Sequence, residues 1–193
     1  MKLPKRNFLK KVFLLLSLRN IVKNAGVTTG AFYGYYRSKE ELFAALVDEA
    51  YQYLLGNYKA AAEGFEQLSP KEQMERMGSV GRECMQKMLV YMRTHPEAAR
   101  LLLFCAEGTP YASLIDDLVE QEIQSTEHYG QMLREQEKTV PAIDQRLEHI
   151  LVTGMVNVYF EIIRHNMSEE DSDRYLCELN DFYTAGWNKI MGQ

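Results

Sequence analysis

Residues 17–39 read SLRNIVKNAGVTTGAFYGYYRSK and hold two short helical patterns separated by a glycine. Apolar residues recur at helical spacing from Leu18 to Ala25, and Gly26 follows where a chain leaving a helix adopts a positive φ angle. Thr28 can cap a second helix, whose apolar residues follow at once. Two short helices joined by a tight turn containing glycine form a helix-turn-helix, whose second helix enters the major groove of DNA.

The residues around this turn match a known signature. The stretch AGVTTGAFYGYYRSKEELF, residues 25–43, resembles the DNA-binding signature of the tetracycline-repressor (TetR) family of transcriptional regulators. The features that carry the resemblance are Ala25-Gly26-Val27, the pair Phe32-Tyr33, the aromatic Tyr36 and the SKEELF opening of the next helix. The resemblance is strong in this N-terminal region, and beyond it only the length and the helical character agree with the family.

The periodicity of apolar residues predicts an all-α fold of about nine helices. Three form an N-terminal helix-turn-helix DNA-binding domain (1–43, the head), and six form a larger helical ligand-binding and dimerisation domain (44–193, the body). We expect the first helix at 5–16 and, after a capping box of Ser38 and Glu41, a long helix from Lys39 to about Glu66. Prolines and a serine cap place the later helices at 70–94, 96–105, 110–137, 141–165 and 168–190.

Charge is distributed unevenly along the chain. The net charge is −5, yet residues 1–39 hold nine basic and no acidic side chains. The basic charge attracts the head to a polyanion, whereas the acidic body is repelled by the same polyanion. The alternative is that the basic run only keeps a terminus solvated.

Several features bear on location and chemistry. The apolar run that ends at Leu16 is too short for an export signal, and no run is long enough to span a membrane. Three widely spaced cysteines, Cys84, Cys105 and Cys177, indicate reduced thiols. No metal-ligand spacing, phosphate loop or nucleophile motif is present, although acidic residues leave an enzyme as a competing class. We expect a cytoplasmic protein without a catalytic residue, metal or cofactor.

The resemblance implies which residues contact double-stranded DNA. The small residues Gly30 and Ala31 would let the recognition helix sink into the groove, and the hydroxyl of Thr28 can reach a phosphate beside free helix amides. Two tyrosines of the same helix would reach the backbone, while Phe32 and Tyr36 face the core of the head. The expected DNA contacts are Arg19, Thr28, Thr29, Gly30, Ala31, Tyr33, Tyr35 and Lys39.

The last two helices carry an apolar surface that predicts a homodimer. Small residues such as Gly154, Ala185 and Gly186 would let two copies approach closely, although burial within one monomer is the alternative. The apolar residues on these helices are Ile150, Leu151, Met155, Val158, Tyr159, Ile162, Ile163, Leu176, Leu179, Phe182, Tyr183, Trp187 and Ile190. A pair of heads would read a palindromic operator with half-sites roughly 34–36 Å apart.

The expected function is a repressor that a small molecule releases from its operator. An adaptable apolar pocket for this unknown effector is expected among body residues, each of which can equally be ordinary core. The candidates are Met77, Cys84, Met88, Phe104, Tyr111, Leu114, Met155 and Tyr159.

The chain departs from the family between Leu16 and Ser17, where TetR-like proteins usually place a loop with a Gly-aromatic pair. Either this connection is shortened, or the sequence omits residues there. A shortened head leaves an alternative function open: a helical dimer that binds a ligand or a protein but has lost DNA binding.

Overall fold

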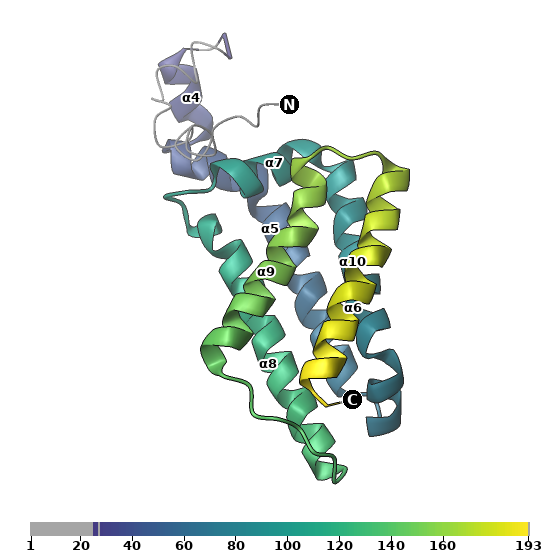
Figure 1. Cartoon of the computed structure of the whole chain (residues 1–193). Coiled ribbons are helices and arrows are strands. Elements are labelled where there is room, and N and C mark those ends of the chain that lie inside the picture. The colour runs from purple at the N-terminus through teal and green to yellow at the C-terminus, as the bar shows by residue number, and fades with distance from the viewer. Residues whose placement is uncertain (1–24, 27, 193) are drawn as a thin grey trace. The chain divides into compact units, whose positions relative to one another are not determined.

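The computed structural model describes residues 25–26 and 28–192, and within them every regular element is a helix (Figure 1). The elements are α4 (Thr29–Tyr35), α5 (Lys39–Glu66), α6 (Pro70–Thr94), α7 (Pro96–Cys105), the 3-10 helix η1 (Pro110–Ser113), α8 (Leu114–Glu135), α9 (Gln145–Arg164) and α10 (Glu169–Ile190). The predicted all-α fold is confirmed. The helix expected at 5–16 lies outside the described residues, so the described part has seven α-helices against the nine expected for the chain.

Local capping explains where these helices begin. Gly26 has a φ of 68°, the positive value predicted for it, and the helix expected before it lies outside the described residues. The backbone amide of Glu41 donates to Ser38 Oγ over 3.2 Å, and the Glu41 carboxylate accepts from the backbone amide of Arg37. This closes the predicted capping box one residue earlier than its usual form.

Two predicted boundaries are wrong. Pro110 begins the 3-10 helix η1, and α8 starts only at Leu114. Pro141 does not begin α9, because Asp144 caps it: the Asp144 carboxylate accepts from the amides of Arg146 at 2.9 Å and Leu147 at 3.2 Å. A side chain that satisfies two free amides outweighs a proline that merely tolerates a first turn.

The chain divides into two compact units. The first unit comprises residues 1–53 and 95–114, and the second comprises residues 54–94 and 115–193. α5 contributes its first half to the first unit and its second half to the second. The expected domain boundary after residue 43 stays a prediction.

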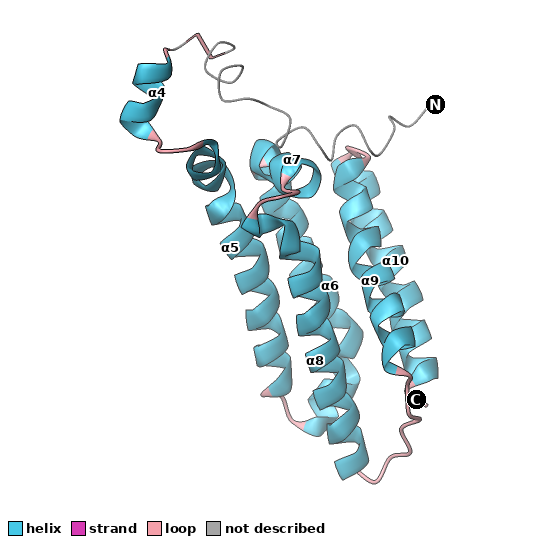
Figure 2. Cartoon of the chain, turned by 90° about the vertical axis from the view of Figure 1, so that its left-hand side faces the viewer, coloured by secondary structure: helices cyan, strands magenta, loops and turns pink. Residues whose placement is uncertain are grey.

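The second unit is a bundle of α6, α8, α9, α10 and the second half of α5, which run side by side (Figures 1 and 2). Its fully buried side chains include Leu54, Met88, Leu118, Val152, Phe160 and Leu176. The Arg93 guanidinium of α6 lies 3.1 Å from the Asp173 carboxylate of α10, which fixes these two helices together near one end. None of the described helices is long and apolar enough to cross a membrane.

Candidate DNA-binding helix and effector cavity

The short helix α4 presents most of its side chains to solvent. Thr28 caps it, because its hydroxyl accepts from the backbone amide of Ala31 at 3.1 Å. Phe32 is the buried residue of α4, and its ring lies 5.5 Å from that of Tyr33 and 5.7 Å from that of Tyr36. Tyr35, by contrast, is 83% exposed. One anchored ring therefore holds a helix whose other side chains remain available to a partner.

The structure places most of the expected DNA contacts on this exposed surface. Thr28, Thr29, Gly30 and Ala31 are exposed, as are Tyr33 and Tyr35. Lys39 is partly buried at the start of α5, with its ammonium 3.9 Å from the Glu40 carboxylate. Arg19 lies outside the described residues. Their role as DNA contacts stays a prediction.

A cluster of aromatic rings lies elsewhere in the first unit. The Tyr111 ring lies 6.0 Å from Phe43 and 5.3 Å from Tyr51, and its hydroxyl donates to the Asp48 carboxylate over 3.0 Å. Three of the expected pocket residues, Phe104, Tyr111 and Leu114, belong to this unit.

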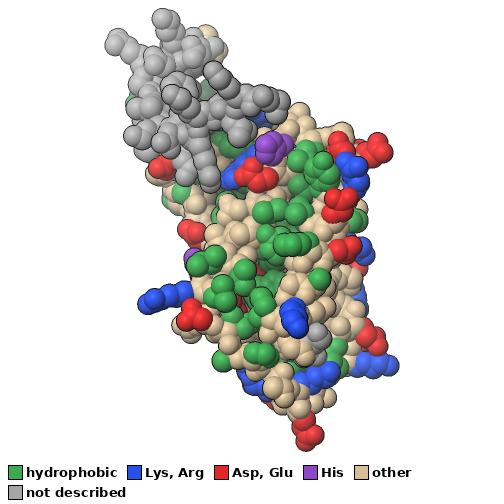
Figure 3. All heavy atoms as spheres, in the orientation of Figure 1, with side chains coloured by type: hydrophobic (Ala, Val, Ile, Leu, Met, Phe, Trp, Pro, Cys, Tyr) green, Lys and Arg blue, Asp and Glu red, His purple; other side chains and the backbone are tan. Residues whose placement is uncertain are grey.

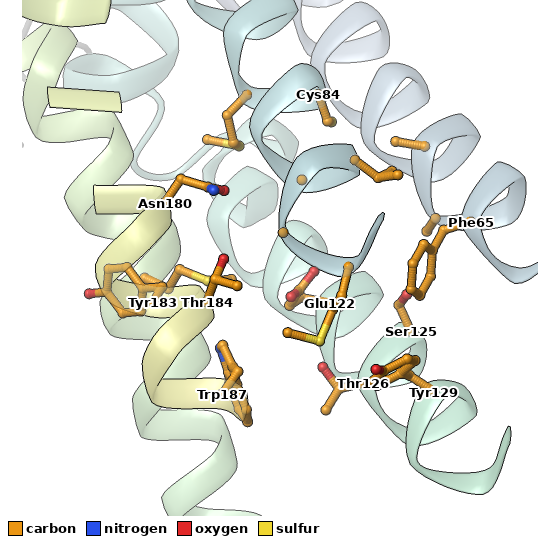
Figure 4. Close-up of a pocket in the computed structure, with 18 of the residues that line it drawn as sticks. Phe65, Cys84, Glu122, Ser125, Thr126, Tyr129, Asn180, Tyr183, Thr184 and Trp187 are labelled. Atoms are coloured by element: carbon orange, nitrogen blue, oxygen red, sulfur yellow. The ribbon is translucent and has the colours of Figure 1, made fainter. Parts of the chain in front are cut away.

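The second unit contains a cavity of about 140 Å³ (Figure 4). Of the expected pocket residues, Met77, Cys84, Met155 and Tyr159 line it, whereas Met88 is fully buried elsewhere in the core. Its other lining residues include Tyr58, Phe65, Glu122, Ser125, Thr126, Tyr129, Asn180, Tyr183, Thr184 and Trp187. The structure thus brings half of the expected set to one cavity and distributes the others.

Glu122 is the acidic residue of this cavity. The Tyr58 hydroxyl donates to its Oε2 over 2.6 Å, and desolvation by burial raises the pKa of the carboxyl. Desolvation also raises the pKa of the Tyr58 hydroxyl, and the neighbouring Glu122 raises it further. Among the residues that line the cavity, all within the described chain, there is no Lys, Arg or His.

Glu122 was not expected in this site, because acidic residues on long helices usually face water. The helical spacing held a signal nonetheless. Leu118, Glu122, Tyr129 and Leu133 recur on one face of α8, and the other three are buried. An acid inside an otherwise inward-facing stripe indicates a carboxylate within the bundle.

The apolar residues of α9 and α10 divide between two directions. Val152, Phe160 and Leu176 face the core, and Trp187 lines the cavity, while Ile150 and Phe182 are 65% and 70% exposed. Hydrophobic side chains gather over these helices in the space-filling view (Figure 3). The small residues Gly154, Ala185 and Gly186 are also exposed. We define the outer face by six exposed residues: Leu147, Ile150, Gly154, Phe182, Ala185 and Gly186. This face is apolar, and its two glycines carry no side chain that would keep a partner at a distance.

Comparison with known proteins addresses the N-terminal region. Residues 8–46 match the family model described as bacterial regulatory proteins, tetR family. The match includes α4 and the first turns of α5, and it runs across the Leu16–Ser17 connection. No solved structure matches the chain. The N-terminal segment of the chain, residues 8–46, is therefore of the tetR family of bacterial regulatory proteins, which supports a DNA-binding transcriptional regulator.

Proposed function

We propose that the protein is a repressor that binds a palindromic operator as a homodimer and is released by a small molecule. The observation that carries the proposal is α4, a capped helix with exposed polar and small side chains inside the family-matched segment. The basic charge of residues 1–39 supports attraction to the duplex, and the acidic remainder limits contact to the head. Such a role implies a cytoplasmic location.

The outer face of α9 and α10 supports the homodimer. A pair of large exposed apolar side chains close to exposed glycines favours self-association, because each copy would cover the other's Ile150 and Phe182. A two-fold contact uses the same face on both copies, so two heads would meet two half-sites of a palindrome.

The cavity of the second unit supports release by a ligand. Tyr58 of α5 lines the cavity, and the same helix begins at Lys39 in the first unit. We therefore expect α5 to couple effector binding in the cavity to DNA binding by the head. A ligand shifts DNA affinity only if it prefers one of two states of the protein, and tight binding alone changes nothing.

The proposal is tested by selecting fragments of the source genome with the intact protein and sequencing those retained. We expect enrichment of an inverted repeat whose half-sites are about one helical turn apart, or a multiple of that spacing. Fragments retained without any common repeat would contradict the operator model.

A second candidate is favoured by the missing Gly-aromatic loop between Leu16 and Ser17. A head shortened in this way would leave a dimer that binds a ligand or a protein but not DNA. Dimerisation and ligand binding with no DNA retained in the same selection would favour this candidate.

A further inference from the structure

We propose that the cavity of the second unit binds a small organic cation about the size of one aromatic ring, with the Glu122 carboxylate as its counter-ion. This inference rests on the proposed function in that it takes the cavity as the effector site. It adds the charge and the size of the effector, which the family match does not specify.

Among the described residues, the lining of the cavity contains one acidic side chain and no basic one. Glu122 is the sole carboxylate among the cavity-lining residues, all of which are described, and no described residue forms an ion pair with it. The titratable groups that surround it are Tyr58 of α5, Cys84 of α6, Tyr129 of α8, Tyr159 of α9 and Tyr183 of α10. Burial raises the pKa of Cys84 to about 12 and raises the pKa values of all four tyrosines, so these groups stay neutral at neutral pH. The described lining of the cavity therefore holds one group that can carry a negative charge and none that can carry a positive one at neutral pH.

The two oxygens of the Glu122 carboxylate differ in their hydrogen-bond partners. Oε2 accepts from the Tyr58 hydroxyl, and no described residue donates a hydrogen bond to Oε1. Figure 4 shows the Glu122 carboxyl among the labelled side chains that line the cavity, between those of α10 and its α8 neighbours Ser125 and Thr126. The Glu122 side chain is half-buried, so Oε1 is open to a ligand, and a bound ammonium would supply both a hydrogen-bond donor and the opposite charge.

Aromatic side chains form much of the lining of the cavity. Rings line the cavity on several sides: Phe65 and Tyr129 have centroids 5.7 Å apart, and Tyr159 and Tyr183 have centroids 6.3 Å apart. Trp187 adds the largest ring. The faces of aromatic rings attract cations, and this attraction strengthens where water is excluded. Carboxylate and ring faces thus select the same ligand charge.

The volume of the cavity indicates the size of a ligand that it can hold. The cavity volume of about 140 Å³ is close to the roughly 150 Å³ of an engineered protein cavity that takes up benzene. One ring with a short cationic arm is therefore a scale of ligand that the cavity can accommodate.

The experiment uses three probes of similar shape: benzylammonium, its neutral counterpart ethylbenzene, and the anion benzoate. Trp187, the one tryptophan of the chain, lines the cavity, so its fluorescence reports occupancy, and calorimetry gives the affinities. We expect benzylammonium to bind at least about tenfold more tightly than ethylbenzene, and benzoate not to bind. The benzylammonium affinity should fall as the pH is lowered toward the raised pKa of Glu122, while the ethylbenzene affinity should not change.

Two matched variants locate the effect. Glu122→Gln keeps the shape and an acceptor for the Tyr58 hydroxyl, and it should remove the preference for benzylammonium without weakening ethylbenzene. Glu120→Gln changes an exposed carboxylate of the same helix and should change neither affinity. Equal binding of benzylammonium and ethylbenzene, or an unchanged preference in Glu122→Gln, would overturn the proposal.

Failure here is separable from failure of the proposed function. An operator found by selection together with no preference for benzylammonium would refute the cation alone. A preference that depends on Glu122, found in a protein that retains no DNA, would uphold the cation and refute the repressor.

Discussion

Substituting Phe182 by glutamate should separate two copies of the chain. Phe182 is 70% exposed on the outer face, and burying a phenylalanine side chain contributes about 1.5–3 kcal/mol, which leaves about 1–2 kcal/mol for its exposed part. A two-fold contact contains the residue twice, so the loss is about 2–4 kcal/mol. At about 1.4 kcal/mol per tenfold, the dimer Kd should rise about thirtyfold or more, before the cost of desolvating two carboxylates is added.

Sedimentation equilibrium over a range of protein concentrations measures this Kd directly. Val90→Glu is the matched control, because Val90 is 50% exposed on α6 and does not belong to the outer face of α9 and α10. Circular dichroism should show the same helical content in both variants. A wild-type Kd for Phe182→Glu, or equal dissociation by Val90→Glu, would refute the assignment of this face.

Three further substitutions test the packing and electrostatics of the second unit. Gly78→Ala should destabilise the fold by about 1 kcal/mol in denaturant unfolding, because a Cβ there would lie 2.6 Å from Thr184 Oγ1 and 2.9 Å from its Cγ2, and overpacking outweighs the gain in helix propensity. Gly56→Ala, with no atom within 4 Å of the added Cβ, should stabilise by up to about 1 kcal/mol, and the reverse order would count against the close contact between α6 and α10. For Glu122, whose folded-state pKa is raised above the ordinary 4.5, the folded state holds the proton longer than the unfolded state. Wild-type stability relative to Glu122→Gln should therefore fall as pH rises from the unfolded-state pKa through the folded-state pKa, and a difference that grows with pH would contradict the desolvation of this carboxyl.

The helices were predictable from the sequence wherever a local device sets them. The starts of α5 and α6 follow from the capping boxes at Ser38 and Ser69, since these interactions join residues three positions apart. The start of α9 was missed because Pro141 permits a first turn without requiring one, while Asp144 supplies hydrogen bonds to two amides.

The direction of side chains was harder to predict than the helices. Phe182 and Trp187 belong to one apolar stripe in the sequence, but five residues turn a helix by about 140° beyond a full turn, so one faces outward and the other lines the cavity. Tyr111 suits an apolar pocket by residue type, but its ring packs on Phe43 and its hydroxyl donates to Asp48. Both partners lie more than sixty residues earlier in the chain. Apolar character alone does not distinguish such partners.

The proposed function depends above all on contact between a DNA duplex and the surface formed by α4 and the start of α5. This contact is tested most directly by titrating a selected fragment at several salt concentrations with the wild type, Tyr33→Ala, Lys39→Ala and, as a control from the second unit, Lys59→Ala. We expect log Kobs to fall steeply and linearly with log salt concentration, Tyr33→Ala to weaken binding, and Lys39→Ala to weaken it while reducing the slope by about 1. Lys59→Ala should behave like the wild type. Binding that is insensitive to salt, or equal affinity in the wild type, Tyr33→Ala and Lys39→Ala, would contradict this contact.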